Sequence, residues 1–392
     1  MRCFGVVACL LAFSGMVALA PTSAVAGARS VNAVPQVEPP QKVPPLARAL
    51  VFDRSHQPTP QPVALKVEDM SVLVEVAARQ PCPDKAILME PQDSPPAPAE
   101  QGCTVATLVV HAPGHSVFRQ AIASLIMGDE GGMVSTLRLS LYHLDRSGGP
   151  LQIVVSGYTM GAHCCTVAAI VGLDGAGQWA VTHLPEQDGD APPTVVDINH
   201  DGGRQFVLKD QRFNYVFASY VWSVLPIVVY DYAHAQLRTV TTQPDYASFL
   251  LAYFRQGFPA FKAPPPPDRK GVNAFLAAYV ANSANLGRFR AGWTYMLHWY
   301  DRSADDDQTW CALDPSVQDG GVSSCPTAYV RKTAYPQKLA LFLLQTGYIT
   351  HAQCVAVGYD PEKIQIGQDA IRAANTAHWR AAHPGPAHTV AP

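Results

Sequence analysis

Hydrophobic and polar positions alternate along much of the chain between residues 63 and 242, in short runs rich in β-branched and aromatic residues. Alternation with a period of two, bounded by Gly, Asp, Asn and Ser, is typical of strands joined by tight turns. Strands are predicted at 63–76, 104–111, 136–144, 151–157, 164–173, 178–184, 194–198, 204–210, 213–218, 226–232 and 236–241. This spacing favours antiparallel hairpins over βαβ units, and one helix is expected at 115–127.

From residue 243 onward the period changes, because apolar residues recur at steps of three and four, as on the buried face of a helix. The four prolines at 264–267 can continue neither a helix nor a central strand, so 263–270 is predicted to be a spacer. We therefore predict an α+β protein. Its parts are an N-terminal antiparallel β domain at 63–242, a helix at 243–262 that packs on or leaves that domain, a small helical domain at 271–380, and a disordered tail at 381–392.

The N-terminus has the pattern of a secretory signal peptide. Arg2 is followed by an uncharged, mostly apolar run, and the run is followed by Ala24-Val25-Ala26. A positive start, an apolar centre and a small-residue site predict a signal peptide at 1–26 that is removed after export. An uncleaved anchor is the alternative, because the run is almost long enough to span a bilayer. Residues 27–62, rich in Pro without periodicity, are predicted to be a disordered leader.

Composition narrows the class of protein further. No later segment is apolar enough to span a membrane, so the mature protein is expected to be secreted or periplasmic. The formal net charge is −3 and no run of Lys or Arg occurs, which argues against nucleic acid as a partner. The sequence has no GxSxG, phosphate-loop or HExxH motif.

Cysteines are expected to form disulfides in an exported protein. Nine occur in the sequence, and two of them lie in the predicted signal peptide, so an odd number remains and one thiol is left free or shared with another chain. Proximity in the sequence favours two pairs, Cys82–Cys103 and Cys311–Cys325. The second pair is expected to staple the helical domain.

Residues 197–210 begin like a calcium loop. Asp197, Asn199 and Asp201 alternate and are followed by Gly202, as in the first half of an EF-hand-type loop. Gln205 falls at the ninth position and supplies a neutral oxygen, and the twelfth position supplies none. Asp210 lies two residues beyond the twelfth position and can complete a ligand set only along a different loop path. The flanking strands exclude an EF-hand, and the alternative is a metal-free turn.

The stretch DINHDGGRQFVLKD followed by FNYVF resembles the Asp-x-Asn-x-Asp-Gly calcium loops of FG-GAP and VCBS-type repeats of secreted bacterial proteins. The resemblance covers one unit, residues 195–232. It implies antiparallel units like propeller blades, with a structural Ca²⁺ held by Asp197, Asn199, Asp201, Gln205 and Asp210. In that family an Asp usually completes the ligand set near the ninth position, and Gln205 departs from this pattern.

Vicinal cysteines beside a histidine form the second candidate site, at Gly161–Thr166. A thiol nucleophile, a metal site and disulfide partners are three interpretations, of which disulfide partners are favoured. On a strand His163 and Cys165 share a face, so they are the candidate base and nucleophile. The stretch also resembles a GGAHCC-like segment of uncharacterised exported proteins, a resemblance that implies no activity.

The aromatic residues Trp293, Tyr295, Trp299 and Tyr300 could line a glycan groove, but their helical spacing is more typical of a core. We predict an exported, non-catalytic binding or scaffold protein of the envelope or extracellular space, with either no cofactor or a structural Ca²⁺. Its partner is an unknown protein or glycan. The alternative is a secreted hydrolase or thiol enzyme that uses the His163/Cys165 region.

Overall fold

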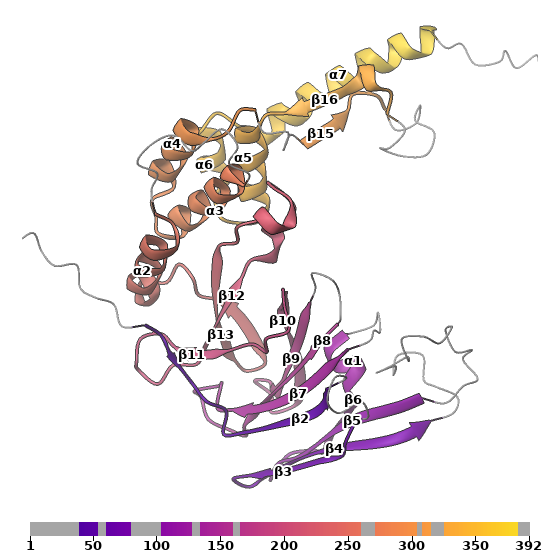
Figure 1. Cartoon of the computed structure of the whole chain (residues 1–392), viewed down its shortest axis with the longest axis vertical. Coiled ribbons are helices and arrows are strands. Elements are labelled where there is room, and N and C mark those ends of the chain that lie inside the picture. The colour runs from indigo at the N-terminus through magenta and orange to yellow at the C-terminus, as the bar shows by residue number, and fades with distance from the viewer. Residues whose placement is uncertain are drawn as a thin grey trace, which may run out of the picture. The chain divides into compact units, whose positions relative to one another are not determined.

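The computed structural model describes residues 39–53, 60–79, 103–127, 134–159, 165–259, 271–303, 308–314 and 325–382 (Figure 1). These residues belong to one compact unit. The predicted signal peptide, the spacer at 263–270 and the end of the predicted tail lie outside the described residues. Apart from one small hairpin, the described strands form three antiparallel sheets.

The first sheet has the order β3-β4-β5-β6, and the second has the order β10-β9-β8-β7-β2. The third sheet has the order β1-β11-β12-β13-β14. The strands of the first sheet are β3 Val63–Val67, β4 Met70–Arg79, β5 Cys103–His111 and β6 Phe118–Ala121. Those of the second are β2 Ala47–Asp53, β7 Thr136–Tyr142, β8 Gln152–Tyr158, β9 Thr166–Leu173 and β10 Trp179–Gln187. Those of the third are β1 Gln41–Lys42, β11 Val195–Asp197, β12 Gln205–Lys209, β13 Ile227–Ala233 and β14 Gln236–Thr239.

The second sheet is covered on both faces. One face packs against the first sheet and α1, Ile122–Met127, through residues such as Leu139, Val155 and Leu108. The other face packs against the third sheet, where Val154 and Ile170 share a cluster with Phe206 and Tyr232. Burial on both faces explains why β8 and β9 are almost continuously apolar, where a half-exposed strand would alternate.

The other face of the third sheet packs on a helix. Val196, Ile227 and Val229 form an apolar cluster with Tyr246 and Leu250. Tyr246 ends the 3₁₀ turn η3, Pro244–Tyr246, and Leu250 belongs to α2, Ala247–Gly257. A helix therefore lies within the range 243–262 and packs on the third sheet. The part of the chain that packs together with the three sheets therefore continues through α2.

The remaining elements are mostly helical. They are α3 Val272–Asn285, α4 Phe289–Trp299, α5 Tyr335–Gln345, α6 His351–Ala356 and α7 Pro361–Ala382, together with a hairpin of β15 Gln308–Cys311 and β16 Val330–Thr333 preceded by the 3₁₀ turn η6, Thr327–Tyr329. Their core contains Leu276, Val280 and Leu339. Among the described residues, no helix combines the length and hydropathy needed to cross a bilayer.

Two strand predictions and one helix prediction need correction. The run 63–76 is two strands, because Glu68 adopts a positive φ of 55° and turns the chain between β3 and β4. The range 213–218 is not a strand. It begins with the last residue of the 3₁₀ turn η1, Gln211–Phe213, and its residues Phe213 and Phe217 are buried in the helical core. The range 115–127 contains β6 and becomes helical only at α1.

The predicted disordered leader is also corrected, because its described part contains β1 and β2. A register shift between Leu50 and Phe52 places Val51 and Phe52 together in the core, where neither is exposed. The bulge disrupts simple alternation, which is why the pattern gave no strand signal. Residues 381–382 continue α7, and no propeller blade is present among the described sheets.

Candidate functional site

The hairpin at 195–210 forms as predicted. Val195 pairs with Phe206 and Val196 with Gln205, so β11 and β12 are antiparallel neighbours. The connecting loop turns at His200 and Gly202, whose φ values are 56° and 82°. A glycine accepts the second of these conformations without strain.

The carboxylates of this hairpin accept hydrogen bonds from the backbone N–H groups of the loop. Asp197 Oδ1 accepts the Asp201 N–H at 3.2 Å, and Asp197 Oδ2 accepts the Gly202 N–H at 2.8 Å. Asp201 Oδ1 accepts the Gly203 N–H at 2.8 Å. The Gln205 amide is buried and hydrogen-bonds within the hairpin. The arrangement is that of an Asx turn, stabilised by its own amides.

Asp210 does not join this loop. Its side chain is buried and accepts hydrogen bonds from Arg212 and from Tyr348 Oη, the latter at 3.0 Å. Asn199 is exposed in the loop. Among the described residues, no group of three or more His, Cys, Asp or Glu side chains is arranged to hold a metal. Calcium binding by the five predicted residues therefore stays a prediction, and the loop brings Asp197, Asp201 and Gln205 together without Asp210.

The second predicted site is described only in part. His163 lies outside the described residues, and Cys165, directly before β9, is buried and disulfide-bonded. A sulfur atom in a disulfide is not a thiolate, so Cys165 in this state cannot be the nucleophile of the alternative interpretation. Disulfide bonding is the interpretation that the sequence favoured for this cysteine.

The predicted pair Cys311–Cys325 is present, with the two Cα atoms 5.8 Å apart. It links β15 to the segment before η6, so it closes a β-hairpin within the range predicted to be helical. Cys82 of the other predicted pair lies outside the described residues. Cys354 is a buried free thiol, and burial is the main cause that raises its pKa.

The predicted aromatic cluster is divided between core and surface. Trp293 is buried, whereas Tyr295, Trp299 and Tyr300 are half-buried. Tyr295 stacks on Tyr279 with ring centroids 4.5 Å apart, and Trp299 is edge-on to its neighbour His298. The cluster is thus mainly part of the helical packing, as its spacing indicated.

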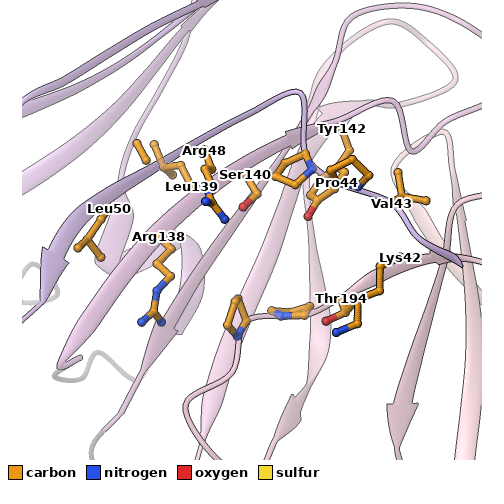
Figure 2. Close-up of a pocket in the computed structure, with 14 residues that line it drawn as sticks. Lys42, Val43, Pro44, Arg48, Leu50, Arg138, Leu139, Ser140, Tyr142 and Thr194 are labelled. Carbon is orange, nitrogen blue, oxygen red and sulfur yellow. The ribbon is translucent and has the colours of Figure 1, made fainter.

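Sequence reasoning missed a groove between the second and third sheets, shown in Figure 2. Its volume is about 900 Å³. One wall is formed by β2 and β7, and the other by the segments that flank β1 and β11 (Figure 2). The lining residues are Lys42, Val43, Pro44, Pro45, Arg48, Ala49, Leu50, Arg138, Leu139, Ser140, Tyr142, Pro192, Pro193 and Thr194.

The register of β2 and β7 places the polar side chains of the first wall. Arg48 is opposite Ser140 and Leu50 is opposite Arg138, so all four lie on the face that looks toward the third sheet. Tyr142, two residues beyond Ser140 on this face, is buried against the third sheet. Arg48 and Leu50 remain exposed, and Arg138 is half-exposed. The third sheet therefore does not cover this part of the second sheet, and the groove lies there.

The groove is cationic. Lys42, Arg48 and Arg138 line it, and no Asp or Glu is among the described residues that do. Neither Lys42 nor Arg48 forms an ion pair in the part of the chain that the structure describes. Arg138 Nη1 donates to Thr136 Oγ1 at 3.2 Å and to the Asp190 carbonyl at 3.4 Å, which leaves its other donors available. Arginine presents planar donors suited to carboxylates and phosphates, so this wall can bind an anion.

A tyrosine and four prolines also line the groove. Burial raises the pKa of Tyr142, although a hydrogen bond with Ser140 and the charge of Arg48 act in the opposite direction. Among the described residues, the lining of the groove includes no histidine and no carboxylate. The prolines on the second wall have no N–H to donate and make a stiff, largely apolar surface.

Comparison with known proteins identifies relatives but no activity. Residues 255–347 match the family described as the sll0997 C-terminal domain. A protein from Synechocystis sp. (strain ATCC 27184 / PCC 6803 / Kazusa), described as probable thylakoid lumen protein sll0997, is 31% identical over 233 residues. Uncharacterized protein y4bJ from Sinorhizobium fredii (strain NBRC 101917 / NGR234) is also 31% identical over 233 residues.

Each match covers 59% of this chain. It covers 66% of the Synechocystis protein and 35% of the Sinorhizobium protein. No solved structure matches this chain. The chain is therefore similar to these two proteins over more than half of its length, and it spans about two thirds of the first and one third of the second.

Proposed function

We propose that this chain is an exported, non-catalytic binding protein and that anionic ligands bind in the groove between its second and third sheets. The observation that carries the proposal is the charge of the groove, with Lys42, Arg48 and Arg138 and no acidic lining residue. Three cations around one hollow repel one another unless an anion lies between them. The protein as a whole carries a net charge of −3, so this site is a local exception.

Two observations support export. The structure contains the Cys311–Cys325 disulfide, and Cys165 is also disulfide-bonded, which is typical of proteins that fold in an oxidising compartment. The Synechocystis relative is described as a probable thylakoid lumen protein, and the lumen is a compartment outside the cytoplasm. Together with the predicted signal peptide at 1–26, these observations support a periplasmic or secreted protein.

Cell fractionation tests the location. The full chain, expressed in a bacterium with a tag at its C-terminus, is expected in the periplasm or medium, with a mass that lacks residues 1–26. A full-length product that stays in the cytoplasm would overturn this half of the proposal. A variant with Ala24 and Ala26 both changed to Arg is the control, because it destroys the small-residue site and should accumulate as the uncleaved precursor.

A binding panel tests the groove. The mature protein is titrated by microscale thermophoresis with polyglutamate, polygalacturonate and polyphosphate, and with dextran as the neutral control. At least one polyanion is expected to bind, and raising the salt concentration should weaken the binding because screening reduces charge attraction.

Arg48→Gln should reduce the affinity about 10-fold, since a hydrogen bond to a charged group contributes about 1.5–3 kcal/mol. Arg255→Gln is the matched control, because Arg255 is an exposed arginine on α2 that does not line the groove. Binding that is equally strong to dextran, or equally sensitive to both substitutions, would show that the groove is not the site.

A further inference from the structure

We infer that the groove recognises an extended peptide segment with acidic side chains at alternate positions. The inference rests on the proposed function, because it names the ligand class of the same site. Four observations carry it, namely the separation of the two arginines, the anchoring of one of them, the scarcity of aromatic surface and the nature of the second wall.

The first observation is a match of spacings. Arg48 lies opposite Ser140, so Arg138, two residues before Ser140 on β7, is the diagonal neighbour of Arg48. Diagonal neighbours on one face of an antiparallel pair are about 7–8 Å apart. An extended peptide advances about 3.3 Å per residue, so side chains at i and i+2 lie on one face about 6.6 Å apart. Two carboxylates at i and i+2 can therefore each face one arginine.

The second observation is that Arg138 is held in place. Its Nη1 donates to Thr136 Oγ1 and to the Asp190 carbonyl, and Thr136 lies on the side of Arg138 that is away from Ser140. These two bonds anchor the Arg138 guanidinium at its own position on β7. The two guanidinium groups are thus kept apart as two separate positions, which favours a ligand with two spaced charges over a single small anion.

The third observation concerns aromatic surface. Tyr142 is the one aromatic residue among the lining residues, and it is only 7% exposed. Nucleobases are commonly bound by stacking on aromatic side chains, and the groove offers no such platform. Nucleic acid, although it is a polyanion, is therefore disfavoured as the occupant.

The fourth observation is the wall that faces the arginines. Pro44, Pro45, Pro192 and Pro193 make it stiff and largely apolar, and Thr194 and Lys42 add a hydroxyl and a third cation (Figure 2). On the arginine side, Leu50 is 42% exposed. These surfaces can contact the aliphatic carbons of a peptide while the arginines and Lys42 bind its carboxylates. An acidic peptide therefore fits the charge and the apolar walls together.

Capped synthetic peptides test the inference with the mature protein. The probe is a nine-residue peptide of Gly, Ala and Val with Asp at positions 4 and 6, and its affinity is measured by isothermal titration calorimetry. The comparison peptides carry Asp at positions 4 and 5, Asp at position 4 alone, or Asn at positions 4 and 6. The 4,6 peptide is expected to bind about 10-fold tighter than the 4,5 peptide and at least 10-fold tighter than the Asn peptide.

Variants locate the two contacts. Arg48→Gln and Arg138→Gln should each weaken the 4,6 peptide about 10-fold, and each should have a smaller effect on the single-Asp peptide because one contact is already missing. Arg255→Gln should leave all affinities unchanged. Equal affinity for the 4,5 and 4,6 peptides would overturn the spacing argument.

The outcomes separate this inference from the proposed function. If polygalacturonate or polyphosphate binds in an Arg48-dependent way and the 4,6 peptide does not, the peptide inference is wrong and the anion-binding function stands. If neither the peptides nor any polyanion binds, both are wrong. Circular dichroism of each variant shows whether it is folded, and Arg48→Lys, which keeps the charge but not the planar donors, should restore part of the affinity.

Discussion

Arg212 holds the buried carboxylate of Asp210 with two hydrogen bonds, from Nε to Oδ1 at 2.8 Å and from Nη2 to Oδ2 at 2.6 Å. Arg212 Nη1 also donates to the Thr346 carbonyl at 3.1 Å, and Tyr348 donates to the same carboxylate. Burial, together with the charge of Asp210, raises the pKa of Tyr348, so its hydroxyl stays protonated and remains a donor. This cluster joins the end of β12 to the segment that follows α5.

Replacement of Asp210 should therefore destabilise the protein. Asp210→Asn removes the charge while it keeps the shape, and we expect a loss of about 2 kcal/mol in the free energy of unfolding. Half-exposure of Arg212 limits the loss, because water can still solvate its guanidinium. Urea unfolding measures the change. Glu75→Gln, which breaks an exposed pair with Arg119, is the control and should reduce the stability much less, because water screens the pair. Equal losses in the two variants would contradict the importance of the buried cluster.

The Asp197 loop should be stable without a cation. Asp197 accepts two loop amides, so Asp197→Ala is expected to lower the free energy of unfolding by about 1–3 kcal/mol in the presence of a chelator. The same loss is expected in millimolar calcium. Thermal melting of the wild type and the variant in both solutions makes the comparison. A loss that appears only in calcium would instead establish the calcium site that the sequence resemblance implies.

Acid should weaken the contribution of Asp145. Burial acts to raise the pKa of Asp145, but hydrogen bonds from Ser147 and from the His234 amide, the latter at 2.6 Å, outweigh burial and leave the pKa below its ordinary value. The stabilisation is therefore complete above the unfolded pKa of about 4 and is lost as the pH falls through the lower folded pKa.

Asp145→Asn should consequently be less stable than the wild type at pH 6, and the difference should shrink below about pH 4. Urea unfolding from pH 6 to pH 2.5 measures this. A difference that stays constant over the range would show that the carboxylate charge contributes nothing.

Loss of the Cys311–Cys325 disulfide should loosen α7. The helix is tied to the hairpin by Thr376, which accepts the Asp314 N–H at 2.9 Å, and by Asn375, which donates to the Ala312 carbonyl at 3.0 Å. A bond that closes a loop of about 15 residues contributes about 3 kcal/mol in the chain-entropy account. Changing both cysteines to Ser should therefore increase hydrogen exchange throughout α7.

Reduction of the wild type should increase hydrogen exchange in α7 by the same amount. Reduction of the double variant should not increase the exchange of α7 any further. Exchange in α2, which packs on the third sheet, serves as the internal reference. Unchanged protection of α7 in the double variant would show that the disulfide is not needed for this packing.

Much of the β architecture could be predicted from local pattern. In strands such as β12, buried Phe206 and Leu208 alternate with Val207 and Lys209, so the sequence indicates which face is buried. The Asp-Gly turn before β12 fixes the hairpin. The pattern failed at Phe213 and Phe217, which are four residues apart and were assigned to a strand. Their burial depends on Phe342 in α5, 4.8 Å and 5.2 Å from their ring centroids, and a local window cannot contain that partner.

The candidate site could not be predicted in the same way. Arg48 lies in a segment whose prolines suggested disorder. Which face of the sheet its side chain occupies is set only by pairing with Ser140, far away in the sequence. A weak signal exists in β7, where Thr136, Arg138, Ser140 and Tyr142 form a polar face on a strand whose other face is Leu137, Leu139 and Leu141. This pattern marks a surface, but the opposite wall at Pro192–Thr194 comes from tertiary structure alone.

The first two strands complete sheets whose other members come much later in the chain, since Lys42 pairs with Val196 and Arg48 with Ser140. The segment around Arg48 can therefore pair only after β7 and β11 have been synthesised, and the groove cannot form before then. A polypeptide clipped just after Asp53 would keep most of its residues yet lose Lys42 and Arg48 at once. If the groove binds anions as proposed, a binding measurement would therefore also test whether the N-terminal segment has docked and the protein has matured completely.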